Sequence, residues 1–247
     1  MNLKNKTVLV TGSSSGIGRA TAVACAQKQA VVLVHYRKNE KGAKETLDQV
    51  NKFSSGQIFK SDLSNPDNVK QLFVQINKEF KSLDCLINNA GEFASGPFED
   101  LTLWQSQFSN IFFSQVYTAV EFLNTKAAVT PRKIVNISSA YGSLNMGIAD
   151  APHYAAAKAA VNSFTCTLAK KVSPDVLVNA IAPGYTWTPN WGEMTEVEKK
   201  PFTDLAKIKR FVKADEVAAM AVQLLENDAV TGEIITVDGG LHLQDIL

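Results

Sequence analysis

Short runs of hydrophobic residues alternate along the chain with longer segments in which hydrophobic residues recur every three or four positions. The short runs have the length of strands and are rich in Val, Ile and Leu. Continuous runs of this kind are typical of strands that helices cover on both faces of a parallel sheet. The pattern predicts seven strands, at residues 7–11, 30–35, 57–60, 83–88, 133–138, 176–181 and 233–237.

The longer segments between these strands have helical spacing. They predict helices at residues 17–29, 39–52, 66–80, 101–127, 154–171 and 214–226. Strands that alternate with helices indicate an α/β fold, a Rossmann-like doubly wound parallel sheet with helices on both faces. The 247 residues contain no evident linker or repeat, so we expect a single domain spanning residues 1–247.

One segment, residues 185–208, follows neither pattern. A stretch of this length between a strand and a helix is more typical of a substrate lid than of a domain boundary. It carries Tyr185, Trp187, Trp191 and Met194, which suggests a substrate with apolar surface. Phe93 and Phe98 are candidates for the facing wall. The alternative is a loop that only docks on the core.

Composition narrows the classes of function. The net charge is +1, from 25 basic and 24 acidic side chains, which gives no reason to expect nucleic acid or a membrane as partner. No hydrophobic run approaches a membrane span, so we expect a cytoplasmic protein. Three separated cysteines predict free thiols rather than a disulfide framework or zinc site: Cys25, Cys85 and Cys166. No metal site is expected, because the three histidines lack ligand spacing: His35, His153 and His242.

A glycine-rich turn follows the first predicted strand and leads at once into a helix. Glycines there allow backbone N–H groups to approach a pyrophosphate, and the helix N-terminus adds partial positive charge. In this context the turn predicts nucleotide binding, against the alternative of an ordinary Gly-rich turn. Its residues are Gly12, Ser13, Ser14, Ser15, Gly16, Ile17 and Gly18.

Tyr154 and Lys158 are four residues apart on a predicted helix and therefore share a face. Lowering the pKa of a tyrosine by about three units needs roughly 4 kcal/mol. A lysine ammonium about 4–5 Å away supplies about that much at an effective dielectric constant near 20. The pair therefore predicts a tyrosine that acts as general acid or base, tuned by the lysine. The alternative is a packed tyrosine beside a solvated lysine.

Several further motifs lie in order on the predicted elements, and with them the chain resembles the short-chain dehydrogenase/reductase family of the compact type near 250 residues. The resemblance runs nearly end to end. The segments that carry it are TGSSSGIG at 11–18, Asp62-Leu63, NNAG at 88–91, ISS at 137–139, YAAAK at 154–158, NAIAPG at 179–184 and DGG at 238–240.

The resemblance implies reduction of a carbonyl by hydride transfer from a nicotinamide, without a metal. It makes Ser139 the serine that stabilises the carbonyl oxygen, in preference to Ser138. It makes Asn110 the helix asparagine that holds a water near the lysine, although the interval from Trp104 is six rather than the usual seven. An ordinary polar role for Asn110 is the alternative. The further cofactor-binding residues it implies are Asp62, Leu63, Asn89, Ala90, Gly91, Pro183, Gly184, Thr186 and Thr188.

The end of the second predicted strand indicates NADPH rather than NADH. An acidic residue there binds the ribose 2′-hydroxyl of NADH, but none occurs between Gly18 and Glu40. Arg37 instead offers a guanidinium that can pair with a 2′-phosphate at two points. Arg19 and Ser13 are candidates to approach the same phosphate.

The substrate is open at this stage. One alternative is a 3-oxoacyl-[acyl-carrier-protein] reductase of fatty-acid synthesis, whose acidic carrier would meet Arg132, Lys133, Lys170 and Lys171. An alternative of another class is a catalytically silent nucleotide-sensing protein on the same fold. Sensor-type relatives usually lose the tyrosine or the lysine, and this chain keeps both. The family resemblance further implies a dimer or tetramer that packs through residues 101–127 and 152–171.

Overall fold

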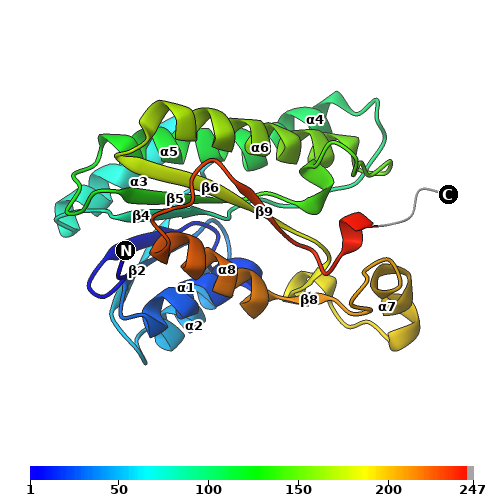
Figure 1. The fold of residues 1–247 in the computed structure, drawn as a ribbon, viewed down its shortest axis with the longest axis horizontal. Helices are drawn as coiled ribbons and strands as arrows, with labels where there is room; N and C mark the ends of the chain where they lie inside the picture. Colours follow the sequence, from blue (N-terminus) through cyan, green and yellow to red (C-terminus); the bar gives the residue numbers. More distant parts are fainter. Residues whose placement is uncertain (244–247) are drawn as a thin grey trace.

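A parallel sheet of seven strands lies at the centre of the computed structural model, which describes residues 1–243 (Figure 1). The strand order is β3-β2-β1-β4-β5-β6-β9, the doubly wound arrangement predicted from the sequence. The bounds of these strands are Thr7–Val10 for β1, Val31–Tyr36 for β2, Gly56–Lys60 for β3, Cys85–Asn88 for β4, Arg132–Ile137 for β5, Val176–Pro183 for β6 and Ile234–Val237 for β9.

Helices cover both faces of this sheet (Figure 1). On one face lie α1 (Gly16–Gln27), α2 (Glu40–Val50) and α8 (Ala214–Glu226). On the other face lie α3 (Pro66–Glu79), α4 (Leu101–Gln107), α5 (Ser114–Asn124) and α6 (Pro152–Val172). Each predicted helix is present within a few residues of its expected bounds, except for the long helix after β4.

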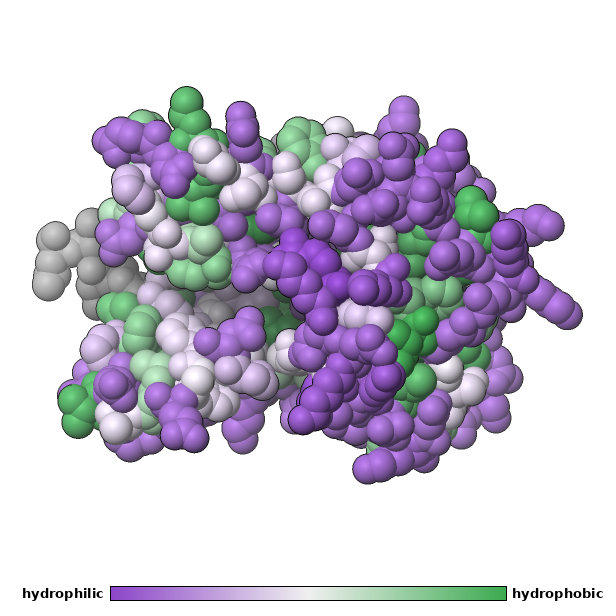
Figure 2. All heavy atoms as spheres, turned by 180° about the vertical axis from the view of Figure 1, so that it is seen from behind, coloured by the Kyte–Doolittle hydropathy of each residue, from purple (hydrophilic) through white to green (hydrophobic). Residues whose placement is uncertain are grey.

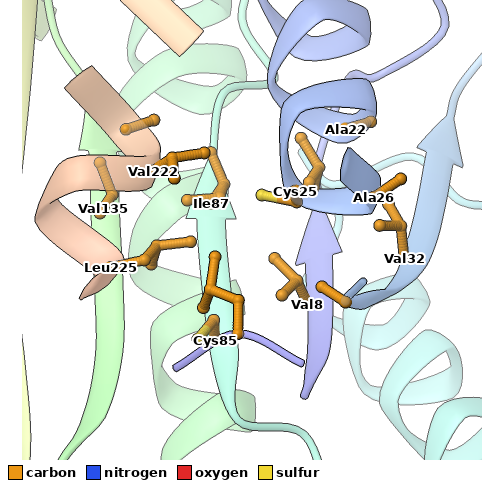
Figure 3. Packing of buried hydrophobic residues seen from close by; sticks show 14 of the residues in the cluster. Val8, Ala22, Cys25, Ala26, Val32, Cys85, Ile87, Val135, Val222 and Leu225 are labelled. Carbon is orange, nitrogen blue, oxygen red and sulfur yellow. The ribbon is translucent and has the colours of Figure 1, made fainter. Parts of the chain in front are cut away.

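Alternate residues of the strands supply the two halves of the core. Val8 of β1 faces the α1 side, whereas its neighbour Leu9 faces the α3 side, and both are completely buried. Figure 3 shows Val222 of α8 and Cys25 of α1 pointing at the sheet. Burying one such side chain contributes about 1.5–3 kcal/mol. Cys25 and Cys85 are part of this apolar packing, as free thiols.

The direction in which the strands are added reverses between β1 and β4. The chain builds outward from β1 to β2 and β3, then returns to place β4 on the other side of β1. In open α/β sheets the carboxyl ends of the strands beside such a reversal form a crevice that binds ligands. Most of the predicted site residues follow the carboxyl ends of β1, β2, β3, β4, β5 and β6 and therefore lie at this edge, whereas Asn110, Tyr154 and Lys158 belong to helices.

Two segments differ from the sequence prediction. The predicted helix at 101–127 is interrupted between α4 and α5 by a π-helix, Phe108–Phe113, which holds more residues per turn than an α-helix. The segment 185–208 is structured rather than irregular. It contains β7 (Thr186–Trp187), the short helix Pro189–Trp191 and α7 (Glu196–Thr203), and β7 pairs with β8 (Val212–Lys213). A capping box of Thr195 and Glu198 begins α7.

Hydrophilic side chains dominate the face drawn in Figure 2, with hydrophobic ones in small groups between them. No helix within residues 1–243 is long and apolar enough to span a membrane. Two of the four basic residues proposed to meet an acidic carrier are not on the surface, because Arg132 is 5% exposed and Lys133 is 1% exposed. Arg132 donates to carbonyl oxygens beneath α5, so only Lys170 and Lys171 are exposed.

Candidate active site

The turn between β1 and α1 brings three glycines together at the carboxyl edge of the sheet. Gly12 and Gly16 have φ angles of 63° and 55°, in the left-handed region that glycine adopts without strain. A Cβ added to Gly18 would lie 2.4 Å from the carbonyl oxygen of Gly12. The turn and the helix can therefore pack this closely only with glycine at these positions.

The N-terminus of α1 faces the crevice and suits an anion. Ser15 is the N-cap residue, its side chain makes no capping hydrogen bond within the described chain, and the first turn contains no acidic residue. The first N–H groups of a helix lack intrahelical acceptors and carry partial positive charge. With Ser14 and Ser15 before it and Gly16 and Ile17 within it, this turn has the shape and the donors that a pyrophosphate requires.

Replacing Gly18 with Ala is expected to raise the KM for the dinucleotide by about tenfold or more, since the added Cβ would force the turn and α1 apart. Titration of the cofactor in steady-state kinetics measures this. Gly147→Ala is the matched control, because a Cβ at Gly147 meets nothing within 4 Å. An unchanged KM in Gly18→Ala would contradict a cofactor role for the turn.

Asn89 holds the turn against the end of β4. Its Nδ2 donates to the carbonyl oxygens of Thr11 at 2.9 Å and of Gly12 at 3.1 Å. The hydroxyl of Thr11 accepts from the N–H groups of Asn89 and Ala90. A Cβ on Gly12 would lie only 2.8 Å from the Cα of Ala90. The NNAG motif thus fixes the position of the glycine turn.

His35 supports the same turn from beneath. Its Nδ1 accepts from the N–H of Gly12 at 3.0 Å, and its Nε2 lies 3.1 Å from the carbonyl oxygen of Ser61. A carbonyl only accepts, so Nε2 carries the proton and the ring is the neutral Nε2–H tautomer. Burial lowers the pKa of His35 to about 4. The sequence reasoning missed this role, because a lone histidine in a strand gave no signal for it.

This burial predicts a loss of stability in mild acid. In the unfolded chain His35 takes up its proton near pH 6.5, whereas the folded chain resists protonation down to about pH 4. The unfolded state therefore binds more protons in this window, and the free energy of unfolding falls as the pH drops, by about 2 kcal/mol between pH 7 and pH 5. Urea unfolding at both pH values measures it. His35→Asn is expected to flatten this pH dependence, and an equally steep dependence in that variant would refute the assignment.

Ser13 and Arg19, the candidates to approach a 2′-phosphate, are hydrogen-bonded to groups of the protein. The Ser13 hydroxyl is buried and accepts from the N–H of His35 at 3.0 Å. The Arg19 guanidinium donates to the carbonyl oxygen of Ser14 at 2.8 Å and to Glu45 at 2.9 Å. Both side chains are thus engaged in holding the turn and α2 together.

Arg37 lies immediately after β2 and reaches across the crevice. It donates to Oδ1 of Asn110 and to Oε2 of Glu92, each at 3.0 Å. The side chain of Arg37 is 31% exposed. Within residues 1–243 this guanidinium is held by one amide and one exposed carboxylate, and it can exchange these partners for a phosphate at small cost.

Asp62 and Leu63 follow β3 at the same edge. Burial raises the pKa of Asp62, but hydrogen bonds from Ser64 and the positive charges of Arg37 and Lys38 outweigh it and hold that pKa below its ordinary value. Asp62 is therefore ionised at neutral pH and available as a hydrogen-bond acceptor. The side chain of Leu63 packs into the core instead.

Ser139 and Tyr154 meet beyond the end of β5. The Ser139 hydroxyl accepts from the N–H of Tyr141 at 3.2 Å, which leaves its own hydrogen for Tyr154. Burial raises the pKa of Tyr154, and the hydrogen bond from Ser139 opposes that rise without overcoming it. The pair therefore has a protonated phenol at neutral pH, as a proton donor requires. Ser138 instead donates to the carbonyl oxygen of Lys158.

Lys158 lies one turn along α6 from Tyr154, whose pKa is raised above its ordinary value rather than lowered as the sequence predicted. Its Nζ is 5.8 Å from the centre of the Tyr154 ring and donates to the carbonyl oxygen of Ile137 at 2.8 Å. Burial lowers the pKa of Lys158 to about 7. Burial is the main cause of both shifts, upward for Tyr154 and downward for Lys158. A Cβ on Gly91 would lie 4.0 Å from Nζ, so the NNAG motif borders the lysine.

Asn110 lies in the π-helix between α4 and α5. Its side chain accepts from Arg37, and its carbonyl oxygen accepts from Ser114 at 2.8 Å. The structure therefore brings Asn110 to Arg37 rather than into hydrogen-bonding contact with Lys158. Its role as the helix asparagine of the family stays a prediction.

The segment after β6 completes the edge. Pro183 ends β6, and a Cβ on Gly184 would lie 2.8 Å from the Cα of Asp238, so the DGG motif packs directly on this turn. Thr186 is buried and donates to the carbonyl oxygen of Gly184 at 3.0 Å. The methyl group of Thr188 would lie 3.2 Å from a Cβ on Gly16. Thr188 therefore borders the glycine turn.

Aromatic rings in and beside the segment 185–208 form a cluster. Two of its members, Phe202 and Phe211, were not identified from the sequence. The rings of Tyr185 and Trp191 pack against those of Phe202 and Phe211, with centroids 4.9–6.4 Å apart. The hydroxyl of Tyr185 is hydrogen-bonded to that of Tyr141. A Phe in α7 and one before β8 show no pattern that distinguishes them from core residues, so the sequence held no signal for this cluster.

Phe93 and Phe98 behave differently from each other. The Phe93 ring packs edge-on against Tyr154 at 5.0 Å and is 54% exposed, so it borders the site as expected. Phe98 packs against Trp104 at 5.7 Å instead. His153 is fully buried and lies 5.9 Å from Trp104, which removes it from the open surface of the cleft.

No group of three or more His, Cys, Asp or Glu side chains in the described part of the chain could hold a metal ion. The chemistry that the local groups themselves offer is proton transfer and hydrogen bonding at Ser139 and Tyr154, beside a turn suited to a pyrophosphate. These features were compared with those of known proteins.

A family model described as Enoyl-(Acyl carrier protein) reductase matches residues 12–242. A 3-oxoacyl-[acyl-carrier-protein] reductase of Synechocystis sp. is 32% identical over 252 residues, which cover 97% of this chain and 98% of that relative. A 3beta-hydroxysteroid dehydrogenase 1 of Eggerthella lenta is 34% identical over 257 residues, which cover 98% and 95%.

Among solved structures, the active-site complex of Pseudomonas aeruginosa RhlG with NADP superposes with a TM-score of 0.90 at 26% identity and covers 98% of each chain. The sequence and structure matches thus extend over nearly the whole length of this chain and of its relatives. At this coverage they show that the chain belongs to the short-chain dehydrogenase/reductase family of oxidoreductases, which act on hydroxyl and carbonyl groups.

Proposed function

We propose that this protein reduces a ketone to an alcohol with NADPH, and that Tyr154 donates the proton. The observation that carries the proposal is the contact between the Ser139 hydroxyl and a protonated Tyr154, at the edge of the sheet that also holds the glycine turn. The family uses NAD(P), and the reduced form, NAD(P)H, would supply a hydride to the carbonyl carbon when bound.

The residues of this chain handle the oxygen of the carbonyl. As the C=O bond gains a hydride, negative charge grows on the oxygen, and the hydroxyls of Ser139 and Tyr154 donate to it. The phenol proton then moves to that oxygen, and a phenolate is left on Tyr154. Lys158 lies 5.8 Å from the Tyr154 ring, and in its ammonium form it stabilises this phenolate until solvent returns the proton.

The experiment is a screen of ketones with each reduced cofactor, in which turnover is measured as the loss of nicotinamide absorbance. We expect turnover with at least one oxygenated or aromatic ketone. Absence of turnover with every ketone, together with tight binding of the dinucleotide, would favour the alternative of a silent nucleotide sensor. Retention of Ser139, Tyr154 and Lys158 in one cluster is the feature that weighs against that alternative.

A reductase of 3-oxoacyl groups on a carrier protein is the second candidate. The sequence similarity to the Synechocystis enzyme favours it. The surface argument for it is weaker than the sequence suggested, because Arg132 and Lys133 are buried. Activity with a 3-oxoacyl thioester of acyl-carrier protein, compared with the same acyl group on a short thiol, tests whether the carrier itself is recognised.

We further propose that residues 185–208 close over the substrate as a unit. The aromatic cluster gives this segment a small hydrophobic core, since Tyr185 and Trp191 pack on Phe202 and Phe211. We expect tryptophan fluorescence to change when a substrate analogue is added to the cofactor complex. An unchanged fluorescence with unaltered protease sensitivity would mean that the segment is a fixed wall.

An assembly of two or four chains through α4, α5 and α6 follows from the family resemblance. The outer surface of these helices supports it, because Phe113 is 40% exposed and Val120 is 51% exposed there, and the rings of Phe113 and Tyr117 stack at 6.1 Å. Sedimentation of the parent and of Val120→Lys tests this surface.

A further inference from the structure

Tyr141 lies beside the serine of the site but has no role in the chemistry proposed above. It occurs two residues after Ser139 and is the middle residue of the short helix Ala140–Gly142. Its backbone N–H donates to the Ser139 hydroxyl at 3.2 Å. This bond fixes the position of the Tyr141 backbone relative to the reacting groups.

The side chain of Tyr141 joins this point to the segment after β6. Its hydroxyl is hydrogen-bonded to the hydroxyl of Tyr185, and the two ring centroids are 5.9 Å apart at an interplanar angle of 67°. The Tyr185 ring is held in turn by Trp191 at 6.0 Å and Phe202 at 5.0 Å. The Tyr185 backbone is fixed as well, since its carbonyl oxygen accepts from Val212 at 2.9 Å. Both hydroxyls therefore have defined positions.

The two hydroxyls retain hydrogen-bonding capacity. A pair of phenols has two O–H hydrogens, and the bond between them uses one. Within residues 1–243 no other hydrogen bond to either hydroxyl is recorded. One donor and several lone pairs are thus left between the serine and the aromatic cluster. Burial raises the pKa of Tyr141, and its bond to Tyr185 and the nearby Tyr154 raise it further, so this hydroxyl keeps its hydrogen at neutral pH.

We propose that the Tyr141–Tyr185 hydroxyl pair is a specificity site that binds a second oxygen of the substrate. The ligand class is a ketone with an ester, thioester or similar acceptor oxygen near the reacting carbonyl, and with an apolar remainder that packs on the aromatic cluster. The inference rests on the proposed function and adds to it the residues that select the substrate. The reacting carbonyl meets Ser139 and Tyr154, while the second oxygen accepts from the spare O–H of the pair.

Polar groups arranged to bond a substrate oxygen reject an analogue that lacks it, because they are then left without a partner in a partly buried place. A hydrocarbon ketone of equal length is therefore a poor substrate. The aromatic rings alone would discriminate in the opposite direction, since they favour the more apolar ligand.

The test compares ethyl 3-oxobutanoate with 2-heptanone, which have chains of equal length and differ in the ester. The ratio of their kcat/KM values is measured in the parent and in Tyr141→Phe, Tyr185→Phe and the double variant. Tyr117→Phe is the matched control, because Tyr117 of α5 has no recorded contact with Tyr141 or Tyr185 within residues 1–243, and the variant keeps the ring that stacks on Phe113. The intrinsic reactivity of the ester-activated ketone cancels when variants are compared through this ratio.

We expect the ratio to fall by about tenfold or more in each single site variant, chiefly through KM, with little further loss in the double variant. A ratio within threefold of the parent in both single variants would overturn the specificity site. So would an equal loss for both ketones, which would make Tyr141 a support for Ser139 only.

A parent that reduces neither ketone would count against the proposed function rather than against the site. In that case the binding of ethyl 3-hydroxybutanoate and of 2-heptanol is measured by tryptophan fluorescence and tests the specificity site. Trp191 reports on the site, because its ring lies 6.0 Å from that of Tyr185. Preference of the parent for the ester, lost in Tyr141→Phe, supports the site, and equal affinities refute it.

Discussion

Tyr154→Phe is expected to lower kcat by at least about 100-fold, in the range that loss of a general acid produces. The substitution removes only the hydroxyl, so no group is left to deliver the proton while Ser139 still donates a hydrogen bond. The ring is retained, and with it the edge-on contact to Phe93 at 5.0 Å. Pre-steady-state and steady-state rates with the best ketone of the screen measure the effect.

Binding of the dinucleotide separates a chemical effect from a structural one. The glycine turn depends on Asn89 and His35 for its position and makes no hydrogen bond to Tyr154 among the described residues. The affinity of Tyr154→Phe for the cofactor is therefore expected to stay within about threefold of the parent. A variant that keeps more than a tenth of the parent rate would show that another group donates the proton.

The fold could be predicted almost completely from hydrophobic periodicity. The seven strands and their flanking helices occur at the expected places because strands such as β1 (TVLV) and β2 (VVLVHY) are short runs rich in β-branched residues and leucine. The π-helix at Phe108–Phe113 could not be predicted, since its hydrophobic spacing is close to that of an α-helix. The structure places it against α6.

The arrangement of the site residues could likewise be predicted only in part. Motif residues that act through their backbone or a fixed neighbour, such as Gly12, Gly18 and Asn89, lie where the sequence placed them. The contacts of long side chains did not follow from sequence. Arg19 and Ser13 are engaged inside the protein, and Lys158 donates to the carbonyl oxygen of Ile137. Which acceptor a flexible or buried polar group finds depends on desolvation and on residues distant in sequence.

Hydroxyl contacts between segments that are distant in sequence could not be predicted either. Tyr141 and Tyr185 are 44 residues apart, and neither belongs to a motif. Their meeting depends on β6 delivering Tyr185 to the edge where β5 has placed the turn of Tyr141, a consequence of the parallel pairing of these two strands. Sequence patterns predict that both strands exist but not which side chains after them touch.

Arg37→Asp is expected to reverse the choice of cofactor. In the parent we expect kcat/KM to be higher with NADPH than with NADH, because the guanidinium after β2 can exchange its bonds to Asn110 and Glu92 for a 2′-phosphate. An aspartate at the same place repels the phosphate and accepts from a ribose 2′-hydroxyl.

The expected change in the NADPH to NADH ratio of kcat/KM is about 100-fold or more, since an attractive contact becomes a repulsive one. Arg37→Gln removes the arginine without adding a negative charge. Its NADPH to NADH ratio of kcat/KM should lie between those of the parent and Arg37→Asp. Glu92→Gln tests the exchange itself. Removing the carboxylate that competes for the guanidinium should lower the KM for NADPH and leave that for NADH nearly unchanged. A parent that prefers NADH, or a ratio that Arg37→Asp does not move, would mean that another residue reads the cofactor.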